Sequence, residues 1–367
     1  MVLTLIIFLL VLSVLIFVHE LGHFLVAKKV GIRVEEFGFG YPPRLFGKKI
    51  GETIYSLNWL PFGGFVRLYG EEIDRQKKDK EAFWQKSKGA RSAVIIAGVT
   101  FNFLLAIVLF TVVYSFSGIP TATDKVRVLG VLPDSPAIHS GLKADDVILE
   151  INSQPLKNSQ DFIEFVEEEK GIEITLTVER ESENLILGVV PRESPPEGEG
   201  PLGVIISSVE MKKYSWWQMP FLSAWQGIKE ALLWLSLIVV ALGKILVDLF
   251  GKGVVPQDVA GPVGIFQITG VVAQTGVLNI MQFVGILSIN LAVINILPLP
   301  ALDGGRLLFI AYEVVTRRKP RQEVEKWVNA GGMAFLLLLI IMVTFNDLKR
   351  LIAWESLGSW WQKIWPF

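Results

Sequence analysis

The stretch LIIFLLVLSVLIFVHELGHFLVAKK, residues 5–29, decides the fold. It is apolar along most of its length, and a helix needs about 20 such residues to cross a bilayer core. Its second half nevertheless contains His19, Glu20 and His23. A charged side chain at the bilayer centre costs about 2.5–3.5 kcal/mol on insertion scales. The stretch is therefore predicted to be a membrane span that also carries a site.

Composition agrees with a membrane protein. The 367 residues are 51% hydrophobic, and the mean hydropathy is +0.48. The absence of cysteine excludes disulfides and thiolate metal ligands, so a metal site must use His, Asp or Glu. Of the three histidines, His139 is expected at the surface and the other two lie in the opening stretch. The formal net charge is −1, and no nucleic-acid partner is expected.

The first span is predicted to be retained rather than cleaved. It has no basic segment before the apolar run, and no small-residue cleavage site follows the run. Further apolar runs divide the rest of the chain. The predicted segments are a first transmembrane helix at 1–27, a β-rich loop at 28–91, a second helix at 92–116, an α+β domain at 117–210, an amphipathic interfacial region at 211–278, a third transmembrane segment at 279–316, a basic turn at 317–327, a fourth helix at 328–346 and a Trp-rich tail at 347–367.

Charge predicts the topology. Residues 28–91 contain 14 Lys and Arg against 8 Asp and Glu, whereas residues 117–210 contain 7 against 18. Basic loops stay in the cytoplasm. We therefore expect the 28–91 loop inside, the 117–210 domain outside, and both chain ends outside. Residues 227–250 are apolar but interrupted by charges, so they either span the bilayer or lie in its interface, and we favour the interface.

The HELGH motif has the spacing of a metal site. His19 and His23 are four residues apart and share one helix face. Two imidazoles in this arrangement can bind one metal ion, and Glu20 beside them can activate water as a general base. Zinc is the expected ion, with Fe(II) or Mn(II) as alternatives. A chance match is disfavoured, because unpaired polar side chains make the insertion of a membrane span less favourable.

A third protein ligand is needed. Glu35 and Glu36 follow Gly31 and so lie outside the first helix. A better candidate is Asp303, within NILPLPALDGGR at 295–306. Irregular backbone at membrane depth is tolerated only where it is buried in protein or lines a wet cavity, so an acid there indicates a site. The alternative is that Asp303 only caps a helix.

These motifs resemble the site-2 protease family of intramembrane zinc metalloproteases, the group of the bacterial regulator of sigma-E protease. The matching parts are HELGH at 19–23, AGVTFN at 97–102, SGLKADDVILEINSQPL at 140–156 and NILPLPALDGG at 295–305. The resemblance implies that His19, His23 and Asp303 ligate zinc and that Glu20 activates water. It implies that Asn295 holds the substrate or the oxyanion, the alternative being an interhelical hydrogen bond.

The resemblance also implies the remaining features of the fold. It predicts a polytopic α-helical membrane protein with four transmembrane helices, a membrane-associated reentrant β-hairpin at 33–70 and one extracytoplasmic PDZ-like α+β domain. That domain would bind peptide or screen bulky substrates. The hairpin would hold an unwound substrate by strand addition, or it is an ordinary interfacial loop. The expected substrate-binding residues are Asn58, Gly63, Gly64, Phe65 and Asn102.

One position departs from the family pattern. The family's second span usually has Gly-Pro-x-x-Asn, and Val99 occupies the Pro position here, between Gly98 and Asn102. The sequence therefore does not decide whether the helix is regular around Val99.

The expected function is intramembrane zinc endopeptidase activity in a bacterial inner (cell) membrane. Its substrates would be single-span membrane proteins already trimmed by an upstream site-1-type protease, such as anti-sigma factors, remnant signal peptides or pheromone precursors. Two rivals stay open. One is a membrane zincin of the HtpX type, with a Glu as third ligand, and the other is a non-catalytic membrane scaffold that uses the PDZ-like domain.

Overall fold

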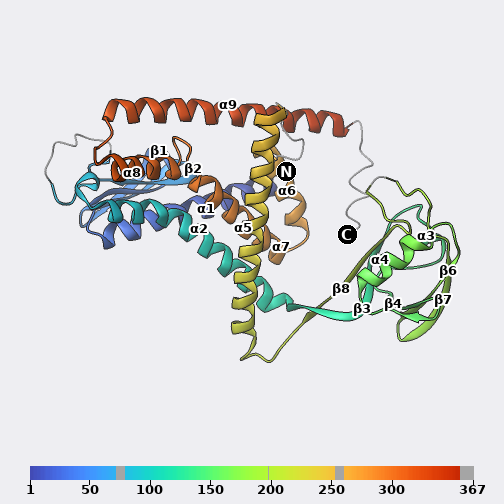
Figure 1. Cartoon of the computed structure of the whole chain (residues 1–367). Coiled ribbons are helices and arrows are strands. Elements are labelled where there is room, and N and C mark those ends of the chain that lie inside the picture. The colour runs from blue at the N-terminus through green and yellow to red at the C-terminus, as the bar shows by residue number, and fades with distance from the viewer. Residues whose placement is uncertain (72–78, 197, 253–259, 356–367) are drawn as a thin grey trace. The chain divides into compact units, whose positions relative to one another are not determined.

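The computed structural model describes residues 1–71, 79–196, 198–252 and 260–355 (Figure 1). The chain divides into two compact units. The first combines Met1–Ser117 with Ser215–Leu351, and the second consists chiefly of Gly118–Tyr214. The candidate site lies entirely in the first unit.

Four helices of the first unit are long and apolar enough to cross a membrane. They are α1 (Val2–Lys29), α2 (Lys88–Ser117), α7 (Val277–Ile296) and α9 (Gln322–Glu355). Helix α2 packs against both α1 and α7. Because α2 is unbroken at Val99, the substitution at the family's Pro position leaves an ordinary helix.

Three further helices complete this unit. Helix α5 (Met219–Lys252) packs along α2 and α7, and α6 (Pro262–Gln274) contacts α1. Helix α8 (Asp303–Thr316) contacts α2 and α7. A short 3-10 turn, η1 (Phe83–Gln85), precedes α2.

A two-stranded antiparallel hairpin, β1 (Val34–Ile50) and β2 (Thr53–Leu68), packs against α1. Its strands pair from Val34 with Leu68 to Ile50 with Thr53. Burial alternates along the first part of β1, which faces the helices, and every residue from Tyr41 onward is exposed. The sequence patterns predicted short strands joined by turns, and this was wrong. The glycines and prolines produce bulges within two continuous strands rather than ending them.

The third apolar segment, predicted at 279–316 with irregular backbone around its prolines, is broken into two helices. Helix α7 ends at Ile296, and α8 begins at Asp303. Proline cannot continue a helix, and Pro298 and Pro300 both lie in the connection. The first turn of α8 lies so close to this connection that a Cβ on Gly305 would be 2.9 Å from the carbonyl carbon of Leu299. The break thus places Asp303 at a helix start inside the bundle.

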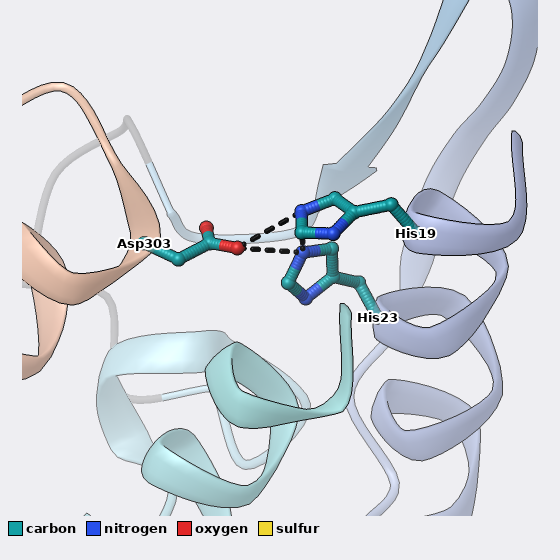
Figure 2. Close-up of side chains that lie close together, drawn as sticks. All are labelled: His19, His23 and Asp303. Carbon is teal, nitrogen blue, oxygen red and sulfur yellow. Dashed lines mark hydrogen bonds and ion pairs between the residues drawn. The ribbon is translucent and has the colours of Figure 1, made fainter. Parts of the chain in front are cut away.

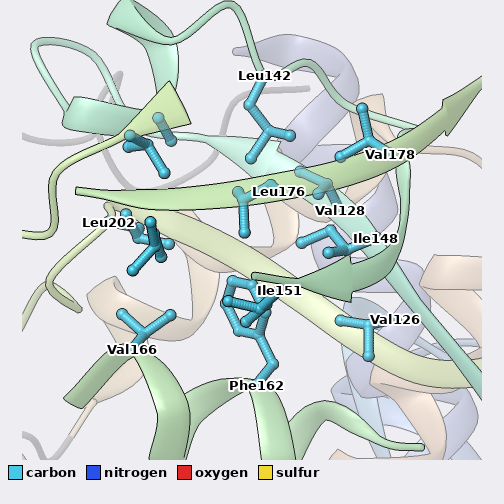
Figure 3. Close-up of a cluster of buried hydrophobic side chains, with 13 residues drawn as sticks. Val126, Val128, Leu142, Ile148, Ile151, Phe162, Val166, Leu176, Val178 and Leu202 are labelled. Atoms are coloured by element: carbon cyan, nitrogen blue, oxygen red, sulfur yellow. The ribbon is translucent and has the colours of Figure 1, made fainter. Parts of the chain in front are cut away.

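The second unit is a six-stranded antiparallel sheet with two helices. Its strands are β3 (Ile119–Val131), β4 (Val147–Ile151), β5 (Gln154–Pro155), β6 (Ile174–Arg180), β7 (Glu183–Val189) and β8 (Val204–Lys212). The order is β7-β6-β4-β3-β8, with β5 beside β4. Figure 3 shows Phe162 and Val166 of α4 (Ser159–Glu168) pointing into the apolar cluster of the sheet. The patterns predicted one helix here, and the structure adds α3 (Pro136–His139), at whose end His139 is exposed.

The C-terminal region also differs from the expected division. Helix α9 runs from Gln322 to Glu355 and so includes part of the basic turn and of the expected tail. The side chains of the tail tryptophans at 354, 360, 361 and 365 lie outside the described part of the chain.

A buried ion pair fastens α8 to α2. Arg91 Nη2 lies 2.7 Å from Glu313 Oε2, and the two side chains are 2% and 9% exposed. Lys88 Nζ donates to the backbone carbonyl of Glu313 at 2.9 Å. Removing one partner of a buried pair leaves an uncompensated charge. This pair therefore holds α8, and with it Asp303, against α2.

We predict that Glu313→Ala lowers the free energy of unfolding by about 3–5 kcal/mol, measured by chemical unfolding in mixed micelles. Asp145→Ala is the control, because it breaks a pair whose side chains are 46% and 89% exposed, and such pairs contribute at most about 1 kcal/mol. The double variant Arg91→Met/Glu313→Leu should recover much of the loss. Equal effects of Glu313→Ala and the control would contradict this role.

Candidate metal centre and active-site cavity

Helix α1 brings two imidazoles together inside the bundle. His19 and His23 occupy successive turns and are 7% and 8% exposed. Their rings meet edge to face with centroids 4.7 Å apart, and their Nε2 atoms are 3.1 Å apart. The helix spacing alone sets this pairing.

Asp303 completes the group from α8, as Figure 2 shows. Its Oδ2 atom lies 3.0 Å from Nε2 of His19 and 3.2 Å from Nε2 of His23. Within the described residues, this is the one group of three or more His, Asp and Glu side chains whose donor atoms converge. The structure therefore brings together residues separated by 280 positions of the sequence.

The donor set fits zinc. Ligands at about 2.0 Å in a tetrahedron lie about 3.3 Å from one another, close to the three separations seen here. Nδ1 of His23 faces the carbonyl oxygen of Val94 at 2.8 Å, and because a carbonyl only accepts, this nitrogen carries the proton. In the neutral ring, Nε2 then presents a lone pair to a carboxylate oxygen. A shared cation would relieve this contact between acceptors, and three protein ligands would leave a fourth position open.

Glycines let α2 approach the two histidines closely. A Cβ on Gly98 would lie 2.6 Å from Cε1 of His19 and 2.7 Å from Cε1 of His23. On α1, a Cβ on Gly22 would lie 2.5 Å from the carbonyl oxygen of Ala97. Small residues at such a crossing allow two membrane helices to pack backbone to backbone. The space in which the rings lie therefore depends on the absence of a side chain at position 98.

Two further polar groups face the same cavity. Glu20 lies beside His19 in the sequence, and a Cβ on Gly64 of the hairpin would be 3.7 Å from its Cγ. Asn295, in the last turn of α7, places Nδ2 3.5 Å from Nε2 of His19. A carboxylate and an amide thus flank the metal-binding group from different helices.

The cavity in front of the group has a volume of about 410 Å³. Its walls come from α1, the hairpin, α2, α7 and α8. At its edge, Arg306 Nη1 lies 2.5 Å from Glu71 Oε1, which joins α8 to the segment after β2. The hairpin contributes Tyr41, Gly64 and Phe65 to the lining. A peptide entering here would meet both a strand and the polar group.

Several predicted site residues meet at this cavity. They are His19, Glu20, His23, Gly64, Phe65, Asn295 and Asp303.

Three of the expected substrate-binding residues lie behind the cavity wall. Asn58 is buried in the hairpin, where it donates to the carbonyls of Phe39 and Gly40. Gly63 packs on the ring of Tyr41. Asn102 is fully buried against His19. Glu36, considered as a third ligand, instead pairs with Arg44 at 2.7 Å.

The sequence reasoning missed other participants. Arg306 lies three residues after Asp303 on a helix, so its spacing was a usable signal. Glu71 and Tyr41 carry no such signal, because they reach the cavity only through the fold of the hairpin. The Val94 carbonyl is a backbone group, and no residue type reveals it.

The HELGH pair on a helix that is apolar enough to cross a membrane, together with the aspartate from α8, defines a site of the metallopeptidase class. The sequence profile of peptidase family M50 matches residues 7–339, and the chain belongs to this family. The predictions of a metalloprotease and of the site-2 protease family are thereby confirmed.

Full-length relatives agree with this assignment. The zinc metalloprotease RasP of Geobacillus kaustophilus is 30% identical over 420 residues, with 94% of this chain and 97% of the relative covered. The regulator of sigma-W protease RasP of Bacillus subtilis is 30% identical over 432 residues, covering 95% and 99%.

A solved structure resembles part of the chain. The PDZ domain of an SdrC-like protein from Listeria monocytogenes is 26% identical and covers 24% of this chain and 93% of that domain, with a TM-score of 0.21. Because this score is low, the description of the second unit rests on its own strand order.

We predict that Gly98→Ala reduces metal affinity by about 10-fold or more, because the added methyl group displaces the imidazole rings. The measurement is zinc competition against a chelator with purified protein. Gly89→Ala, in the same helix, is the matched control, since a Cβ there meets no atom within 4 Å. Wild-type affinity in the Gly98 variant would contradict the packing argument.

Proposed function

We propose that this membrane protein is an intramembrane zinc endopeptidase. The observation that carries the proposal is the convergence of His19, His23 and Asp303 beside Glu20, in a cavity between apolar helices and a hairpin. The relatives named as zinc metalloproteases support zinc as the metal. When bound, zinc would supply Lewis-acid chemistry that polarises the scissile carbonyl and lowers the pKa of water.

The protein groups would divide the remaining work. Glu20 would take a proton from the attacking water and deliver it to the leaving amine. The amide of Asn295 would donate to the oxygen on which negative charge develops. Arg306 lies in the first turn of α8, three residues after Asp303, and forms an ion pair with Glu71.

The position of the hairpin supports a role for β2 in holding the substrate. A peptide bond in a helix has its carbonyl already bonded, so it must be extended before water can attack. Gly64 and Phe65 of β2 line the cavity next to Glu20. An exposed strand edge can bind an extended peptide by main-chain hydrogen bonds. The proposed substrate is therefore a single-span segment that unwinds against β2.

The proposed setting is a bacterial inner (cell) membrane. The 28–91 loop would be cytoplasmic, and the second unit would be an extracytoplasmic PDZ-like domain that binds or excludes substrates by size. We further propose that an upstream site-1-type protease trims the substrates first. Anti-sigma factors fit this class, and one relative carries the name regulator of sigma-W protease RasP. Remnant signal peptides fit equally.

Two variants test the chemistry. Glu20→Gln should abolish cleavage of a trimmed single-span substrate, by about 10²-fold or more, while zinc content stays at the wild-type level. Asp303→Ala should lose both zinc and activity. Glu35→Gln should keep both, and its loss of zinc would instead favour a zincin with a Glu ligand. Undiminished cleavage by Glu20→Gln would sink the proposal, and a wild-type protein without zinc would favour a non-catalytic scaffold.

The topology can be tested by labelling, because the chain has no cysteine of its own. We expect Lys157→Cys in the second unit to react with an impermeant maleimide on intact spheroplasts. Lys80→Cys, between β2 and α2, should react only after permeabilisation. Both positions are exposed in the structure. The reverse pattern would place the second unit in the cytoplasm.

A further inference from the structure

One stripe of α2 contacts both metal-binding histidines. Val94, Gly98 and Asn102 are spaced four residues apart, so they share a helix face. The carbonyl of Val94 bonds Nδ1 of His23 at 2.8 Å. Gly98 leaves room for the two rings, and the Asn102 amide is placed with its nitrogen, Nδ2, 3.4 Å from Nδ1 of His19. Val94 and Asn102 therefore contact the Nδ1 atoms of the two rings, whereas the Nε2 atoms face Asp303.

The backbone of Asn102 is anchored to α7, but the oxygen of its side chain has no hydrogen-bond partner among the described residues. Its exposed fraction is 0%, and its backbone carbonyl accepts a hydrogen bond from Ser288 Oγ of α7 at 2.8 Å. Its Oδ1 atom is buried and has no hydrogen-bond partner among the described residues. A buried acceptor left without a partner costs about 1–3 kcal/mol. A packing role alone gives no reason for an amide at this position.

The tautomer of His19 supplies the reason. If the amide nitrogen faces the ring, it donates to Nδ1, and the neutral ring then carries its proton on Nε2, where it blocks metal binding. If the amide oxygen faces the ring, it accepts the proton of Nδ1 and leaves the Nε2 lone pair free. The two ends of an amide have nearly the same shape, so the site accommodates either. His23 already has the second arrangement through Val94.

We propose that Asn102 is a positioning residue whose amide oxygen accepts the Nδ1 proton of His19 and so directs the Nε2 lone pair toward the metal. This inference rests on the proposed function, since it assigns the outer partner of a zinc ligand. It replaces the expectation that Asn102 touches substrate, because the residue lies behind His19 and outside the cavity lining. Outer partners of this kind change metal affinity by about 10–100-fold.

Two substitutions separate positioning from packing. Asn102→Leu keeps a similar volume but has no acceptor, and we expect a drop of about 10–100-fold in zinc affinity. Asn102→Asp keeps an acceptor, and a carboxylate bonded to a ligating histidine is a common arrangement, so we expect affinity at or above wild type. A packing role predicts the opposite order, because leucine fits an apolar helix contact and a buried carboxylate does not.

The measurement is zinc competition against a chelator with purified full-length protein in detergent. Thr100→Val is the control on the same helix, since its exposed hydroxyl only bonds the Ile96 carbonyl within α2. Melting temperatures of the metal-free variants report packing separately. Weak binding by the Leu variant and wild-type binding by the Asp variant would support the inference.

Other outcomes would overturn it. Wild-type affinity in the Leu variant, or loss of affinity in the Asp variant, shows that the acceptor does not matter. These results leave the proposed function intact as long as the wild type holds zinc. A wild type without zinc would contradict the proposed function, and this inference with it.

Discussion

Three polar side chains meet at one point inside an apolar helical bundle, and the surrounding structure follows from the cost of burying them there. His19, His23 and Asp303 would each be unfavourable alone at membrane depth. Their donor atoms lie 3.0–3.2 Å apart, a separation that one shared cation explains. A metal bound between α1 and α8 would offset the cost of burying all three groups and would join two segments that are far apart in the sequence.

The backbone around this point is arranged to allow that cross-link. The connection from α7 to α8 contains two prolines and a residue, Ala301, with a φ of 71°. Non-helical backbone at this depth needs cover from protein, and α9 provides some of it. Asn329 accepts a hydrogen bond from the Ala301 amide, and a Cβ on Gly332 would lie 2.8 Å from the carbonyl of Pro300. The same glycine-based packing recurs at Gly98.

Part of this arrangement could be predicted from the sequence. The four-residue spacing of the histidines and the proline break before Asp303 are local signals, because they depend only on helix geometry and backbone chemistry. The resemblance placed a hairpin at 33–70, but the residue pattern divided it into short strands, because a glycine that forms a bulge and a glycine that ends a strand look alike without the partner strand. The tie between Glu71 and Arg306, the Val94 carbonyl and the place of Asn102 depend on how helices pack, and no spacing within one segment contains that information.

If one zinc ion joins α1 to α8, X-ray absorption at the zinc edge of the purified protein should detect it. We expect one zinc per chain, with two imidazole nitrogens and a carboxylate oxygen at about 2.0–2.2 Å. In Asp303→Ala, any zinc that remains should have lost one oxygen from its coordination shell. Six oxygen neighbours, or a spectrum unchanged in that variant, would contradict a zinc ion shared by the two helices.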